Sequence, residues 1–124
     1  MRVTTFIADG DTVRAEAAKE PAWQPFSVYD GKPLERVQLV EVEKLSLGEI
    51  QLVEIAAGGR FAMHTSPDVA FCQIVRGKGK LGLPGGTEIP YEGPELYVFH
   101  PGSLHDWHDI EEDTLLSVCL VHAG

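Results

Sequence analysis

The sequence predicts an all-β domain built as a sandwich or a barrel. Thirteen glycines and eight prolines interrupt the chain at short intervals. The runs between them are short and rich in Val, Ile, Leu, Phe and Tyr, which are residue types that favour strands. The chain has 124 residues, the length of one domain. Many short strands within one domain of this size are typical of sandwiches and barrels.

The first 35 residues are expected to lie outside the barrel. Residues 11–20 are rich in Ala and Glu and are followed by Pro21. Their apolar side chains form a poor stripe, so a short N-terminal helix and a turn both remain open there. The aromatic segment 23–29 comes next, ahead of a turn at residues 30–33. We expect this segment to pack over one end of the barrel or on a partner subunit.

The barrel core is expected to span about residues 36–122 as a single domain. We predict strands at residues 36–45, 49–57, 60–64, 69–76, 79–83, 88–91, 95–100, 104–109 and 114–122. The last of these strands is apolar on both faces, which indicates either a central position in the sheet or a dimer interface. The glycine-rich turn at residues 83–87 is expected to serve backbone geometry rather than phosphate binding, because no helix follows it.

Composition and charge exclude several functions. The net charge of −9 disfavours nucleic acid and anionic membranes as partners, because like charges repel. No apolar run approaches the roughly 18 residues that a membrane helix needs. Residues 1–10 lack the apolar core of a secretory signal, so we expect a cytoplasmic protein. Cys72 and Cys119 both lie in apolar runs, which predicts two buried free thiols.

Two segments place a histidine after a glycine turn at the start of a β-rich stretch. In the first segment, His64 follows Gly58 with five residues between them, and Gly77 closes the segment. In the second segment, His105 follows Gly102 with two residues between them. These two segments resemble the two conserved motifs of the cupin family.

The resemblance implies a cupin-type double-stranded β-helix, that is, a jelly-roll barrel, over roughly residues 37–121. In this family, two His and one Glu of the first motif and the His of the second motif bind a divalent metal ion inside the barrel. His64 and His105 match two of these four positions. Ser66 and Ala70 stand where the family has the second His and the Glu. The resemblance therefore implies a metal site that has lost two of its ligands.

The sequence offers two candidates for a third ligand. Alternation along a strand puts Cys72 on the same face as Ala70, where it is either a soft metal ligand or a packed thiol. His100 stands at the proline position of the second motif, beside the pocket mouth, and either turns inward or lies exposed in a turn. His108 follows His105 by three residues, so alternation directs it to the opposite face.

Alternation with the two histidines also predicts the lining of the pocket. The predicted lining residues are Phe61, Met63, Ser66, Cys72, Ile74 and Trp107. Such a lining favours an apolar or aromatic small molecule with one or two polar groups. Without a ligand, the same side chains would simply fill the core of a small barrel.

Three functions follow from the sequence. The first is a small-molecule-binding cupin with a weak site for one divalent ion (Fe, Zn, Mn, Ni or Cu) at His64 and His105. If this protein is an enzyme, the resemblance implies metal-dependent oxygenase, isomerase or lyase chemistry. The second is a metal-free cupin that binds or senses a small ligand, with a histidine as general acid or base. The third is an oligomerisation module without catalytic activity; the resemblance also implies a homodimer.

Overall fold

The computed structural model describes residues 1–122, and its regular elements are all β-strands. β1 (Phe6–Asp9) and β2 (Thr12–Ala15) form an antiparallel hairpin. Gly10 has a φ of 61° in the two-residue turn, a conformation that glycine adopts freely, and β-branched residues follow the turn. The helix considered for residues 11–20 is therefore wrong. Within residues 1–122, no helix is long and apolar enough to cross a membrane.

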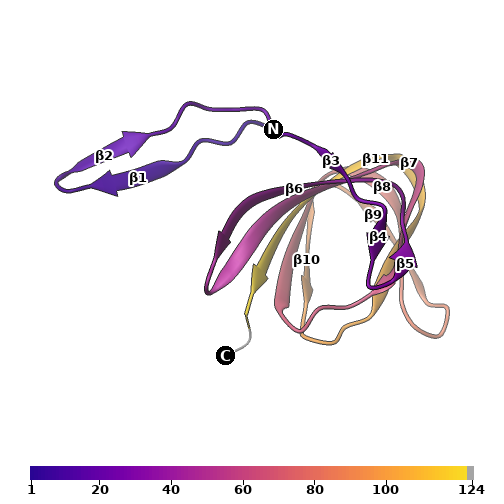
Figure 1. Cartoon of the computed structure of the whole chain (residues 1–124). Coiled ribbons are helices and arrows are strands. Elements are labelled where there is room, and N and C mark those ends of the chain that lie inside the picture. Colours follow the sequence, from indigo (N-terminus) through magenta and orange to yellow (C-terminus); the bar gives the residue numbers. More distant parts are fainter. Residues whose placement is uncertain (123–124) are drawn as a thin grey trace.

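The β1–β2 hairpin forms an N-terminal arm that extends away from the rest of the molecule (Figure 1). Its side chains are almost all exposed, including Phe6 (69%) and Val13 (70%). A bridge between Val3 and Lys19 closes its base. A two-stranded hairpin is marginally stable by itself in water, so the arm would gain stability from any surface that covered these apolar side chains.

One antiparallel sheet carries most of the chain and bends into a barrel (Figure 1). Its strand order is β10-β8-β11-β7-β6-β3, and β9 also pairs with β8. The strands are β3 (Gln24–Pro25), β6 (Glu35–Leu45), β7 (Gly48–His64), β8 (Val69–Gly82), β9 (Glu88–Glu92), β10 (Glu95–Phe99) and β11 (His105–Val121). A separate small hairpin joins β4 (Val28–Tyr29) and β5 (Lys32–Pro33). The all-β jelly-roll prediction is confirmed.

Three pairs of predicted strands are halves of single long strands. Residues 49–57 and 60–64 both belong to β7, and β8 and β11 each join two predicted segments in the same way. Gly58 and Gly77 have positive φ values within β7 and β8, and the β11 pairings shift register near the same level. Such irregularities bend a strand without ending it, which is how long strands close a barrel.

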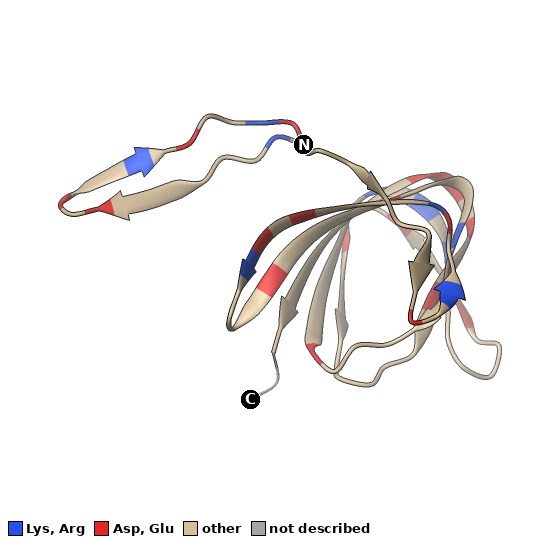
Figure 2. Cartoon of the chain, in the orientation of Figure 1, with Lys and Arg blue, Asp and Glu red and all other residues tan. Residues whose placement is uncertain are grey.

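β11 lies between β7 and β8, the central position that its two apolar faces predicted. The buried core comprises Leu34, Val37, Val53, Ile55, Phe61, Cys72, Ile74, Leu81, Tyr91, Trp107, Ile110 and Leu116. Cys72 is a buried free thiol, as expected, whereas Cys119 is only half-buried. Cys119 pairs with Phe71 and Ile50, which are both exposed, so it lies on the outer face of the sheet. Charged side chains are distributed over both the arm and the barrel (Figure 2).

Candidate functional site

His64 and His105 meet inside the barrel. His64 is the last residue of β7 and His105 is the first residue of β11, and the two are direct partners in the β7–β11 register. Their ring centroids are 4.4 Å apart. His105 is 7% exposed. The two histidines that the motifs single out therefore form one pair at the end of the barrel interior.

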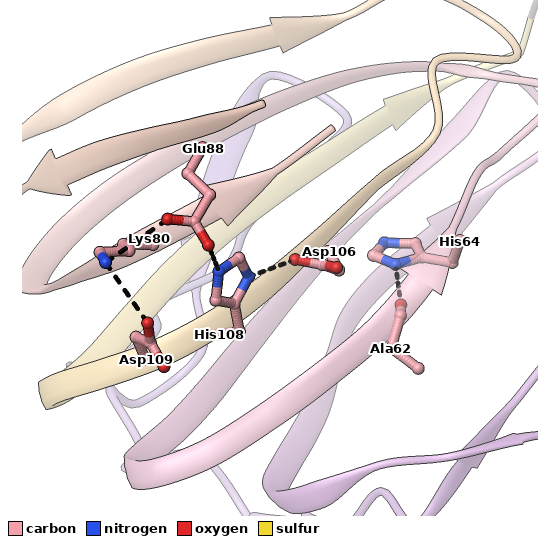
Figure 3. A network of polar contacts seen from close by, with 7 residues as sticks. All are labelled: Ala62, His64, Lys80, Glu88, Asp106, His108 and Asp109. Atoms are coloured by element: carbon pink, nitrogen blue, oxygen red, sulfur yellow. Dashed lines mark hydrogen bonds and ion pairs between the residues drawn. The ribbon is translucent and has the colours of Figure 1, made fainter. Parts of the chain in front are cut away.

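Backbone carbonyls fix the tautomer of both imidazoles. The Nδ1 atom of His64 lies 2.8 Å from the carbonyl oxygen of Ala62 (Figure 3), and that of His105 lies 2.9 Å from the carbonyl oxygen of Ser103. A carbonyl oxygen only accepts hydrogen bonds, so each Nδ1 carries a proton and donates it. In the neutral ring, each Nε2 then holds a free lone pair, which is available to a metal ion or a hydrogen-bond donor.

Burial keeps both imidazoles neutral. Desolvation and the neighbouring His105 lower the pKa of His64 from 6.5 to about 4. Desolvation also lowers the pKa of His105. His64 is therefore uncharged at neutral pH. Its Nε2 atom can accept a proton or ligate a metal there, but this atom has no proton to give as an acid.

The histidine pair lines a cavity of about 120 Å³ with aromatic walls. The ring of Phe99 stacks on His105 with a centroid distance of 3.8 Å, and Phe61 lies 4.2 Å from His64. Phe26 and Tyr29, from the segment that precedes the barrel, pack on Phe61 and complete this wall. The aromatic segment thus lies against the cavity within its own chain.

The structure distributes the predicted lining residues over three places. Phe61, Ser66, Cys72 and Trp107 line the cavity. Ile74 is fully buried in the core instead. Met63 lines a groove on the outer face of the barrel. Met63 lies outside because of a register shift in the β7–β11 pairing, where His105 pairs with His64 but Trp107 pairs with Phe61. The shift turns both Phe61 and His64 inward, so Met63, the neighbour of His64, points outward.

The third-ligand candidates line the cavity but do not converge on the histidine pair. Both Cys72 and His100 are lining residues. Burial raises the pKa of the Cys72 thiol to about 12, which opposes formation of the thiolate that binds metals. Among residues 1–122, neither side chain forms with His64 and His105 a group of three ligand atoms that lie within 4.8 Å of one another.

Sequence reasoning missed two polar residues of the cavity. Asp68 lines it, and its carboxylate accepts a hydrogen bond from Nδ1 of His122 at 2.9 Å. Thr65 also lines it, and within the described part of the chain its buried Oγ1 has no hydrogen-bond partner. The available signal was position: Asp68 is the one carboxylate between Ser66 and Ala70, where the family motif has its missing ligands.

A second polar cluster lies in the outer groove, a depression of about 680 Å³ beside the β8–β9 turn. Nδ1 of His108 lies 2.5 Å from Oδ1 of Asp106, and its Nε2 lies 2.9 Å from Oε1 of Glu88 (Figure 3). The Nζ atom of Lys80 lies 3.4 Å from carboxylate oxygens of both Glu88 and Asp109. Burial disfavours the charged ring of His108, but the hydrogen bonds to Asp106 and Glu88 outweigh burial and raise its pKa.

Three side chains of this cluster could hold a metal ion. Ligand atoms of Glu88, His108 and Asp109 all lie within 4.8 Å of one another, and no other such group occurs among the described residues. The sequence prediction placed His108 on the face opposite His105 but did not connect it with Glu88. Glu88 lies 20 positions earlier in the chain and reaches His108 only through the β8–β9 hairpin.

No protein-family model and no curated protein matches the sequence. Solved structures do match the fold. A cupin 2 conserved barrel domain protein from Rhodopseudomonas palustris matches with a TM-score of 0.69 and 21% identity, over 100% of this chain and 81% of its own. The cupin domain of Schizosaccharomyces pombe Cnp3 matches with a TM-score of 0.73 and 11% identity, over 98% and 88%. The polyketide cyclase RemF from Streptomyces resistomycificus matches with a TM-score of 0.60 and 16% identity, over 70% and 66%.

Together with the barrel topology and the inward-facing histidine pair, these matches identify the fold. The chain has the cupin fold.

Proposed function

We propose that this protein binds a small molecule in the barrel cavity and that His64 and His105 hold one divalent metal ion there. The observation that carries the proposal is the orientation of the two rings. Each donates its Nδ1 proton to a backbone carbonyl and keeps the Nε2 lone pair free, in a wall of the same cavity. Metal-binding histidines are commonly oriented in this way by a hydrogen bond from their other nitrogen.

The donor set suits a weak and open metal site. Imidazole nitrogen is a good ligand for Fe, Zn, Mn, Ni or Cu ions, but catalytic sites usually have at least three protein ligands. With two protein ligands, the remaining positions would belong to water or to the bound molecule. When bound, the metal would act as a Lewis acid on an oxygen atom of that molecule.

The cavity also restricts the chemistry of its ligand. Its volume of about 120 Å³ lies below the range of roughly 300–1,000 Å³ for sites that hold drug-sized molecules, so the ligand is small. The aromatic walls favour a planar or apolar body. The neutral Nε2 atoms accept hydrogen bonds, so a carboxylate would need the metal as a bridge, whereas an amine or alcohol could bind without it. The latter is the metal-free alternative, supported by the absence of a third converging ligand among residues 1–122.

Metal content tests the proposal. We expect untagged wild-type protein, stripped with chelator and re-equilibrated with Mn²⁺, Ni²⁺ or Zn²⁺, to retain one more equivalent of at least one ion than His64→Ala/His105→Ala. Elemental analysis after equilibrium dialysis against the ion, corrected for the metal content of the dialysis buffer, measures this difference, and circular dichroism checks that the variant is folded. Equal metal content in the two folded proteins would contradict metal binding at this pair and leave the metal-free ligand site.

A second candidate function, self-association as a homodimer, is supported by an apolar stripe on the outer face of the sheet. Ile50, Cys119, Phe71 and Val98 are register partners across β7, β11, β8 and β10. Ile50, Phe71 and Val98 are each 40–47% exposed. An exposed stripe of this kind is the type of surface that interfaces cover.

Light scattering at increasing protein concentration tests the dimer. We expect wild type to have the mass of a dimer and Phe71→Glu to have that of a monomer, because a buried unpaired carboxylate would disfavour the interface. The matched control is Gln73→Glu, which adds the same charge at the next exposed position of β8. A monomeric wild type, or a Phe71→Glu variant that stays dimeric, would contradict an interface at Phe71.

A further inference from the structure

We propose that Glu88, His108 and Asp109 form a second divalent transition-metal site, in the outer groove, and that Lys80 occupies its cation position until a metal ion displaces it. The site is independent of the histidine pair in the barrel. His105 lines the interior cavity, whereas His108 lines the groove on the outer face of the same strand. Neither His64 nor His105 belongs to the outer group.

The donor set is that of a transition-metal site. One imidazole nitrogen and two carboxylates present ligand atoms within 4.8 Å of one another, so a single ion can touch all three after small side-chain movements. Mixed imidazole and carboxylate ligands suit Zn²⁺, Mn²⁺ or Fe²⁺ better than Mg²⁺ or Ca²⁺, which prefer oxygen ligands alone. The groove leaves the remaining coordination positions open to water or a substrate.

The buried carboxylate of Asp106 holds the imidazole ring of His108 in position. Asp106 is 8% exposed and accepts a hydrogen bond from Nδ1 of His108, which directs Nε2 toward Glu88 (Figure 3). A carboxylate in this position orients the ring and makes it a better ligand. Gly82, the register partner of both Asp106 and Glu88, provides the space: a Cβ atom there would collide with the Asp106 carboxylate and lie 2.9 Å from Cε1 of His108.

Lys80 already places a cation where the two carboxylates meet. Its ammonium group lies 3.4 Å from Oε2 of Glu88 and 3.4 Å from Oδ2 of Asp109. The side chain is 41% exposed, so it can move into solvent when a metal ion arrives. The metal ion then takes the place of the ammonium and of the proton on Nε2 of His108, and that proton goes to solvent. Lys80 therefore competes with the metal ion and lowers its apparent affinity.

Zinc titration tests this competition in a background that lacks the interior pair. In this experiment, Zn²⁺ is titrated by calorimetry into untagged His64→Ala/His105→Ala protein and into the same protein with the further substitution Lys80→Met. We expect Lys80→Met to bind Zn²⁺ about tenfold more tightly, because it removes a repelling charge next to the metal position. The matched control is Lys78→Met, which removes the same charge two residues earlier on β8, where the lysine pairs with Glu111 instead.

Loss-of-ligand variants complete the test. We expect Glu88→Gln to weaken Zn²⁺ binding strongly, and Asp106→Asn to weaken it by about 10- to 100-fold as a supporting carboxylate does. Tighter Zn²⁺ binding by Lys80→Met cannot result from misfolding. The test therefore remains decisive even if Asp106→Asn does not fold. The proposal is overturned if the background protein binds no Zn²⁺ even with Lys80→Met, or if Lys80→Met, Lys78→Met and Glu88→Gln all share one affinity.

Discussion

Gly77→Ala is expected to lower the free energy of unfolding by about 3–5 kcal/mol, from backbone strain and overpacking together. Gly77 has a φ of 119°, a backbone conformation that residues other than glycine rarely adopt. A Cβ atom there would lie 2.5 Å from Cα of Thr114, so backbone and not a flexible side-chain tip would have to move. Thr114 is fully buried and shares a hydrogen bond of 2.6 Å with the Tyr91 hydroxyl, which extends the disturbance into the core.

The variant Gly85→Ala measures the cost of backbone strain without the steric collision that is expected in Gly77→Ala. Gly85 also has a positive φ, of 87°, but a Cβ atom there would meet nothing within 4 Å. We therefore expect only the strain, about 1–2 kcal/mol, for this variant. Urea unfolding followed by tryptophan fluorescence measures both values. If both variants lost the same free energy of unfolding, the steric collision between a Cβ atom at residue 77 and Thr114 would not be the main cause of destabilisation.

Acid is expected to destabilise the metal-free protein through His64, by about 2–3 kcal/mol between pH 7 and pH 4. The folded-state pKa of His64 is about 4, below the ordinary value of 6.5. Below about pH 6.5, the unfolded chain gains a proton at residue 64 that the folded chain excludes until the pH approaches 4. The folded state therefore has its full stability when the pH is above about 6.5. It loses the contribution of neutral His64 as the pH falls from about 6.5 toward 4.

The measurement compares urea unfolding of wild type and His64→Gln in EDTA across this pH range. His108 has a raised pKa and stabilises the folded state at low pH, an effect of opposite sign that both proteins share. The difference between the two curves isolates His64. We expect the advantage of wild type over His64→Gln to shrink steadily as the pH decreases. Parallel curves would mean that His64 is not desolvated as the structure indicates.

Much of the fold was predictable from the sequence because the relevant signals are local. Glycine and proline spacing and β-branched runs predicted the strands, and the spacing of His64 and His105 within their motifs predicted that the two would meet. The N-terminal segment was harder, because its alanines favour a helix while its Gly10 turn favours a hairpin. Two competing local preferences of similar strength do not decide a structure by themselves.

The face on which each side chain lies was predictable only where the register is regular. Simple alternation placed His108 opposite His105, in agreement with its position in the outer groove. Counted from Phe61, it failed for Met63, because the register shift between Phe61 and His64 brings both of these side chains inward and leaves Met63, the neighbour of His64, outside. A bulge is a property of two paired strands, so the sequence of one strand does not reveal it.

The sequence alone therefore determined the all-β class, the cupin-type barrel and the histidine pair, because these depend on turn residues, strand propensity and motif spacing. Tertiary structure decided what surrounds those residues. In the folded barrel, Phe26 and Tyr29 lie over the cavity, and Glu88, on the second strand of the β8–β9 hairpin, lies in hydrogen-bond contact with His108. These contacts join segments far apart in the chain, and their geometry is set by how the whole barrel closes rather than by any local pattern.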